Sequence, residues 1–218
     1  DMDAAQTEVS EATRTATFTP GRDAARKEAS KLNVPRIGVR FRLPASMNQV
    51  EYFGRGPAEN YLDRNAGSMI GLYKSTAEEL YFPYVRPQEN GHHTDTRWVS
   101  LSTGKKGLLI QADNTIGFNA LRNSIEDFDD EEATGLPRQW SNFTPEQVAN
   151  HDEAAAKNVL RRQHHINDIT PRDFVEVCVD LKQQGVAGYD SWGSRPEPAY
   201  TLPANREYNW GFTLIPLK

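Results

Sequence analysis

The sequence has a single cysteine, Cys178, among its 218 residues. One cysteine excludes an internal disulfide framework and any metal site built from several thiolates. Because Cys178 lies in an apolar run, we expect it to be a buried, small hydrophobic residue. An unpaired cysteine fits a reducing cytoplasm and a periplasm equally well, so the compartment stays unknown.

Long apolar runs and long basic runs are also missing. No stretch approaches the roughly 20 apolar residues that a membrane-spanning helix needs, so we expect no membrane partner. The formal net charge is −5, and without a basic stripe nucleic acid is not an expected partner. With 37% hydrophobic and 25% charged residues, the chain can nevertheless build a sizeable core.

Residues 1–33 show little apolar periodicity and no signal-peptide pattern. We interpret them as an N-terminal tail or linker, or as a truncated part of the domain that follows. Within this region, residues 22–32 are rich in Ala, Lys and Glu and predict a short helix. Residues 34–218 are then predicted to form one domain.

From Arg36 onward, apolar and polar residues alternate in several segments, which is the period of half-buried β-strands. Clusters of Gly, Pro and Asn between these segments predict hairpins and longer loops. Thr144 and Pro145 form a helix start and predict one helix between Thr144 and Gln163. The predicted fold class is therefore all-β and antiparallel, with one short helical insertion. The predicted strands are 36–43, 107–112, 175–181 and 208–214.

Three segments combine Gly and Pro with aromatic, carboxylate and amide groups, and we interpret each as a loop. Aromatic rings can cover the apolar face of a sugar while polar groups bind its hydroxyls. Alternatively, Tyr61, Tyr84 and Trp98 are core aromatics. In that interpretation Asp63 and Arg64 hold loops through charge-assisted hydrogen bonds. The segments are YFGRGPAENYLDR over 52–64, PYVRPQENG over 83–91 running on to residues 95–98, and GVAGYDSWG over 185–193.

Together the three segments resemble the C-terminal small-chain domain of glycoside hydrolase family 2 β-galactosidases. That family's pattern is GRGP-x-ENY-x-DR, then PYV-x-PQENG with a downstream RW, then G-x-GG-x-DSWG. Order and spacing agree over residues 34–218, and residues 35–38 match the preceding strand, whereas Ala187 stands where Gly is usual. The resemblance implies a large antiparallel β supersandwich, similar to galactose mutarotase, that packs beside a TIM barrel.

The resemblance also implies a sugar-binding role without catalysis. Such enzymes hydrolyse terminal β-D-galactosides with retention, using two glutamates of the barrel. In the family the acid/base glutamate directly follows an asparagine, and this sequence has no Asn-Glu dipeptide. We therefore expect no catalytic residue in this chain. Trp192 matches the tryptophan that stacks on sugar in some members of the family, and Asp190, Glu89 and Asn90 are the other candidate substrate-binding residues.

The expected partners follow from the same resemblance. They are a β-galactoside and the TIM barrel and other domains of the parent enzyme, with a homo-oligomer left open. The magnesium and sodium sites of the family belong to other domains, so we expect no metal or cofactor in this chain.

The sequence contains two pairs of adjacent histidines, His92-His93 and His164-His165. Neighbouring residues on a strand point to opposite faces, so we expect one packed and one solvated ring rather than a shared metal. Because Glu89, His92 and His93 are close in sequence, a mutarotase-like epimerase that shuttles a proton stays an alternative. A free-standing carbohydrate-binding module is another. The motifs favour the accessory domain of a β-galactosidase.

Overall fold

The computed structural model describes residues 32–85, 88–128, 166, 169–190 and 193–218, and it contains seven strands. The part of the chain that it describes contains no α-helix, only short 3-10 turns such as η1 (Ile125–Asp127) and η4 (Pro198–Tyr200). The helix predicted over 144–163 lies outside the described residues, and so does the one predicted over 22–32 except for Leu32, which is not helical. The strands are β1 (Arg36–Pro44), β2 (Gln49–Gly56), β3 (Met69–Thr76), β4 (His93–Ser102), β5 (Gly107–Leu121), β6 (Phe174–Gln183) and β7 (Phe212–Leu217).

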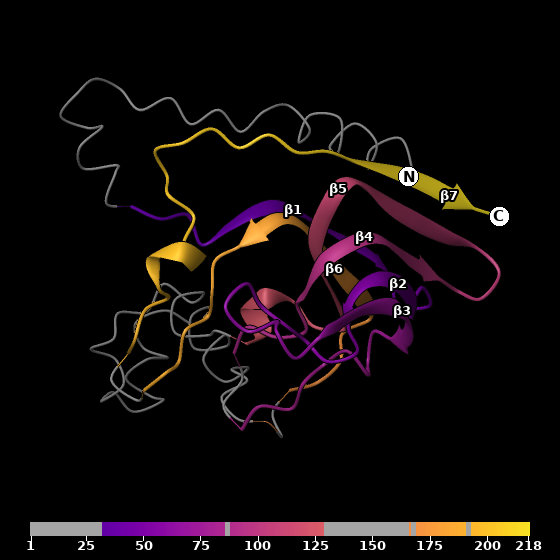
Figure 1. The fold of residues 1–218 in the computed structure, drawn as a ribbon. Helices are drawn as coiled ribbons and strands as arrows, with labels where there is room; N and C mark the ends of the chain where they lie inside the picture. The colour runs from indigo at the N-terminus through magenta and orange to yellow at the C-terminus, as the bar shows by residue number, and fades with distance from the viewer. Residues whose placement is uncertain (1–31, 86–87, 129–165, 167–168, 191–192) are drawn as a thin grey trace, which may run out of the picture.

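All seven strands belong to one antiparallel sheet in the order β1-β6-β5-β4-β2-β3, with β7 beside β5. The 15-residue β5 pairs with different strands along its length. Its residues 107–112 pair with β7, and its residues 117–121 pair with β6. Figure 1 shows β5 curving between these two neighbours. The prediction of an all-β antiparallel fold is confirmed, and the arrangement is consistent with a β-sandwich. No helix in the described residues is long and apolar enough to cross a membrane.

One face of the sheet carries the apolar core. On β1 the alternation is as predicted, because Val39, Phe41 and Leu43 pack against the core while Arg40 and Arg42 are exposed. The core is built from the apolar side chains of β2, β4, β5 and β6, among them Val50, Tyr52, Val99, Leu101, Ile110, Phe118, Val175, Val177 and Val179.

The prediction that β6 is half-buried is wrong, because both of its faces are covered. Glu176, Cys178 and Asp180, on the face away from the core, are all buried. Arginines of the neighbouring β1 cover the carboxylates: Arg42 Nε lies 3.0 Å from Glu176, and Arg36 Nε lies 3.1 Å from Asp180. The expectation that Cys178 is buried is confirmed, and burial raises the pKa of its thiol to about 12.

The last strand also differs from its prediction, since β7 begins at Phe212 rather than at Tyr208. The Tyr208 hydroxyl donates to the Pro203 carbonyl, so this part of the chain is held by a neighbouring loop. Pairing with β5 starts only after Gly211, whose carbonyl accepts a hydrogen bond from Asp113 N–H.

The three unusual segments are not all loops. The first begins inside β2 and the second ends inside β4, so the interpretation of both as loops is wrong at these ends. Their glycines and polar side chains hide the alternation that marks the other strands. The described part of the third segment does lie outside the strands, as expected.

Candidate functional site

Glu59 of the first segment joins that segment to the second. Its carboxylate accepts hydrogen bonds from Arg64 Nη2 at 2.7 Å, from Gly91 N–H at 2.7 Å and from the Tyr61 hydroxyl at 3.2 Å. The Tyr84 hydroxyl is a fourth donor. Tyr61 is a core aromatic and Arg64 holds a loop, so these two interpretations are confirmed. The carboxylate thus fixes two segments that are well separated in sequence.

Asn90 acts as a clamp on the chain that precedes it. It is 2% exposed, its amide nitrogen donates to the Phe82 carbonyl at 2.5 Å, and its amide oxygen accepts from Phe82 N–H at 2.8 Å. Both ends of this amide are therefore occupied inside the protein. A sugar contact by Asn90 stays a prediction, and it would require these bonds to break.

Glu89 lies at the entrance to a buried polar cluster. Its side chain is 27% exposed, and its carboxylate accepts from Arg36 Nη2 at 3.2 Å and from Asn119 Nδ2 at 3.3 Å. Arg36 also donates to Asn119 Oδ1 at 2.8 Å and to Gln183 Oε1 at 2.7 Å. Asp180 lies deeper in the cluster. Burial raises the pKa of its carboxyl group to about 7, because this effect is larger than the opposing effect of the positively charged Arg36. The sequence pattern gave no signal for this cluster beyond Arg36, which stands in the matched strand.

His92 and His93 are both buried, so the expectation of one solvated ring is wrong. Burial is the main cause that lowers the pKa of each to about 3. The polar cluster covers the face that was expected to be solvated, and His92 Nδ1 lies 2.8 Å from Asn119 Oδ1. Gly117 makes room for this ring, because an added Cβ would lie 2.5 Å from it. His164-His165 lies outside the described residues.

A hollow of about 500 Å³ opens where all three segments meet. Its volume falls within the range of small-molecule sites, roughly 300–1,000 Å³. Asp63 accepts hydrogen bonds from the backbone amides of Val186 and Ala187, two of the lining residues, which confirms its predicted loop-holding role. The lining residues are Tyr61 and Arg64 from the first segment, Gln88 and Glu89 from the second, Gly185 to Gly188 from the third, and Pro35, Gln183 and Gln184.

The third segment continues from this rim to the remaining predicted site residues. Asp190 is exposed just beyond the lining residues. Trp192 lies outside the described residues, so neither its exposure nor its contact with sugar is tested. In the chain segments that the structure covers, no group of three or more His, Cys, Asp or Glu side chains could hold a metal ion.

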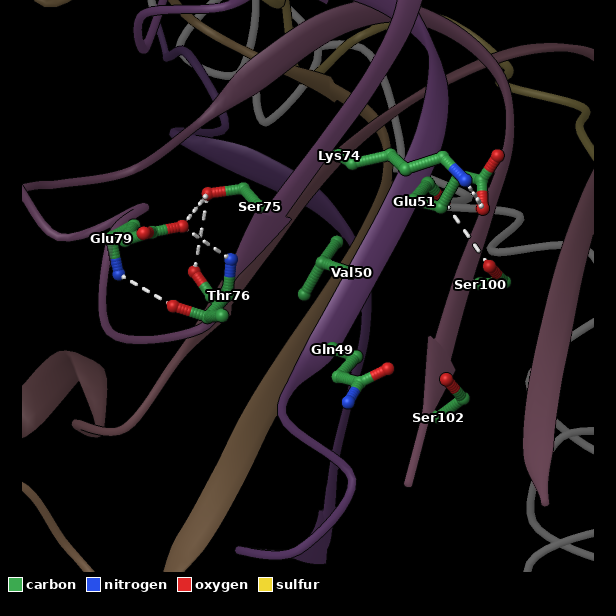
Figure 2. A pocket seen from close by; sticks show the side chains of 9 residues that line it. All are labelled: Gln49, Val50, Glu51, Lys74, Ser75, Thr76, Glu79, Ser100 and Ser102. Atoms are coloured by element: carbon green, nitrogen blue, oxygen red, sulfur yellow. Dashed lines mark hydrogen bonds and ion pairs between the residues drawn. The ribbon is translucent and has the colours of Figure 1, made fainter. Parts of the chain in front are cut away.

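A second hollow, of about 420 Å³, lies over β2, β3 and β4 (Figure 2). Its polar side chains largely pair with one another. Lys74 Nζ lies 3.3 Å from a Glu51 carboxylate oxygen, and Glu79 accepts from the Ser75 hydroxyl and from Thr76 N–H. This hollow lies outside the three unusual segments, so we place the candidate site at the first one.

Comparison with known proteins identifies the family of the chain. Residues 3–214 match the family described as "Beta galactosidase small chain". The chain belongs to this family. The resemblance to the small-chain domain of β-galactosidases is confirmed.

Several β-galactosidases contain a region similar to this small-chain domain. That of Priestia megaterium is 35% identical over 185 residues, covering 84% of this chain and 15% of that protein. That of Arthrobacter sp. is 41% identical over 99 residues, covering 43% of this chain and 10% of that protein. That of Vibrio cholerae is 29% identical over 181 residues, covering 83% of this chain and 14% of that protein. The chain thus spans about 15% or less of the length of these relatives.

Proposed function

We propose that this small-chain domain is a non-catalytic accessory part of a β-galactosidase and forms one wall of its sugar site. The observation that carries the proposal is the convergence of all three segments on one hollow. The third segment lines this hollow with Gly185 to Gly188, and Asp190 and Trp192 follow these residues in the sequence. In the proposed assembly, the barrel of the parent enzyme supplies the two catalytic glutamates, and metal ions bind in other domains.

The engagement of the local carboxylates supports a non-catalytic role. A retaining glycosidase needs two accessible carboxyl groups about 5–5.5 Å apart, one of them an acid with a raised pKa. Here Asp180 has a raised pKa but is only 1% exposed, which keeps it from a substrate. Glu89 is held by Arg36, Glu59 by Arg64, and Asp63 by backbone amides.

The buried histidines weigh against the epimerase alternative. Proton transfer at a sugar's anomeric centre needs an acid and a base within hydrogen-bond reach of the substrate, with pKa values near the working pH. His92 and His93 are buried and have pKa values lowered to about 3. One observation, the volume of the hollow, supports the other alternative, a free-standing carbohydrate-binding module.

Calorimetry with lactose separates the binding module from the accessory domain. We expect the isolated chain to bind lactose only in the millimolar range or not at all, because one aromatic wall contributes roughly 1 kcal/mol. Binding at 1 mM already requires about −4 kcal/mol. A dissociation constant near 10 μM that Trp192→Ala abolishes would overturn the accessory role and favour the module.

A further inference from the structure

An exposed apolar stripe crosses β2 and β3 on the face of the sheet opposite the core. Ile70 and Leu72 of β3 are 43% and 58% exposed, and Phe53 of β2, which pairs with Leu72, is 36% exposed. Trp98 of β4 pairs with Phe53 on its other side and is half-buried. Because Tyr52 belongs to the core, its neighbour Phe53 points to the other face, and paired residues share a face. These four side chains form the β2–β3 stripe.

The β2–β3 stripe ends at a free edge of the sheet. In the described part of the chain β3 is the last strand of the order, so one of its edges pairs with no other strand (Figure 1). Folded proteins usually protect such edges with charged residues, proline or a covering element. Lys74 is the only charged residue of β3, and the strand contains no proline. We therefore expect another polypeptide surface to cover the stripe.

The charged groups beside the stripe are already paired within the chain. Lys74 Nζ lies 3.3 Å from a carboxylate oxygen of Glu51 on one side of the stripe, and Arg55 pairs with Asp95 on the other. The Arg97 guanidinium lies 5.5 Å from the ring centroid of the phenylalanine in the stripe. An apolar centre with a polar rim is the usual anatomy of a protein interface. A partner needs few compensating charges here, so its own surface is expected to be apolar.

The size of the stripe favours a partner within the same polypeptide. A fully exposed large apolar side chain offers about 200 Å², so the exposed fractions of Phe53, Ile70 and Leu72 leave roughly 300 Å². A stable contact between separate chains buries about 800 Å² on each partner. A covalently joined domain needs less, because the link supplies a high effective concentration. In the β-galactosidases of Priestia megaterium and Vibrio cholerae the similar region is 15% and 14% of one long chain.

We propose that the β2–β3 stripe docks this domain on an apolar face of a neighbouring domain in the same β-galactosidase polypeptide. This inference rests on the proposed function, an accessory part of such an enzyme. The stripe shares no residue with the lining of the hollow at which the three segments meet. Docking and sugar contact therefore use separate surfaces of the domain.

Hydroxyl-radical labelling read by mass spectrometry tests whether the stripe is covered. The isolated chain is compared with a chimera in which it replaces its counterpart in the Priestia megaterium β-galactosidase. We expect Phe53 and Leu72 to be labelled at least fivefold more slowly in the chimera. Equal labelling rates in the two forms would overturn the proposal. A dimer of the isolated chain that Leu72→Asp dissociates would also overturn it, because a second copy would then be the occupant.

Limited proteolysis tests the contribution of the stripe to docking. Leu72→Asp places a charge in the proposed interface, so the domain should be cleaved at least tenfold faster in the chimera. The isolated variant should be cleaved at the rate of the isolated parent chain, since Leu72 is exposed there. Val85→Asp is the matched control, because Val85 is 82% exposed and lies outside the stripe. It should leave the rate unchanged in both forms.

Equal cleavage rates for the two variants in the chimera would refute the docking role. The sugar role is tested separately by the lactose kinetics of Trp192→Ala, which these two measurements do not use. Failure of the docking surface and failure of the proposed function are therefore distinguishable.

Discussion

Replacing Asn60 with alanine is expected to lower the free energy of unfolding by about 3 kcal/mol, since buried groups lose their partners. Asn60 is 0% exposed. Its amide nitrogen donates to the carbonyls of Arg55 and Ala58, each at 3.1 Å, and its oxygen accepts from Thr94 N–H at 2.9 Å and from the Thr94 hydroxyl at 2.6 Å. The substitution leaves a buried backbone N–H without an acceptor. Urea unfolding should show a lower midpoint with an unchanged slope.

Asn48→Ala is the matched control for this measurement. Asn48 also makes two side-chain hydrogen bonds, at 3.1 and 3.3 Å, but both go to the Glu78 carboxylate in an exposed setting. Water replaces these partners, so the free energy of unfolding should change by no more than about 0.5 kcal/mol. A similar decrease in the free energy of unfolding for the two variants would contradict the stabilising role of the buried Asn60 hydrogen bonds.

Replacing His93 with phenylalanine is expected to protect the protein against acid. The pKa of His93 is lowered to about 3 by burial, whereas an unfolded histidine titrates near 6.5. Below about pH 6.5 the unfolded state therefore binds a proton at this histidine that the folded state does not bind. The free energy of unfolding decreases as the pH falls further. Between pH 7 and pH 5 this loss reaches about 2 kcal/mol for one histidine.

Phenylalanine keeps the packing of His93 but does not titrate. The ring stacks on Tyr52 with centroids 4.9 Å apart and meets the edge of Phe118, while Nδ1–H donates to the His92 carbonyl. The variant should therefore gain about 2 kcal/mol relative to the parent chain as the pH is lowered from 7 to 5. Unfolding curves recorded across this range measure the difference, and parallel pH profiles would contradict the account.

Asp180→Asn provides a control of opposite sign. Because the pKa of Asp180 is raised to about 7, the folded protein binds a proton as the pH falls through 7, well before the unfolded chain does. This protonation stabilises the parent chain at lower pH. The asparagine variant lacks it and should lose stability relative to the parent over the same range.

Local patterns in the sequence predicted much of the fold. The alternation of residues 36–43 and 175–181 matches β1 and β6, because an apolar face against the core requires that period. The polar face of β6 was mispredicted, since its burial depends on Arg36 and Arg42 from another strand. Such partners are set by strand pairing, which no local pattern reveals.

The candidate site was predictable only in part. The motifs located the three segments that line the hollow, and Glu89 is one of the lining residues. The Asn90 side chain instead forms hydrogen bonds with the backbone of Phe82. A short amide side chain in a loop can bind nearby backbone groups as readily as it binds a ligand. The contact of Asp63 with Val186 spans more than a hundred residues and follows from tertiary structure alone.

We propose that this domain supplies an aromatic wall to the sugar site of a β-galactosidase without taking part in the chemistry. The most direct test compares the chimera of the Priestia megaterium enzyme with its Trp192→Ala variant. Loss of one stacking contact, roughly 1 kcal/mol, predicts a KM for lactose about fivefold higher and a kcat within twofold. An unchanged KM, or a kcat reduced a hundredfold or more, would contradict the account.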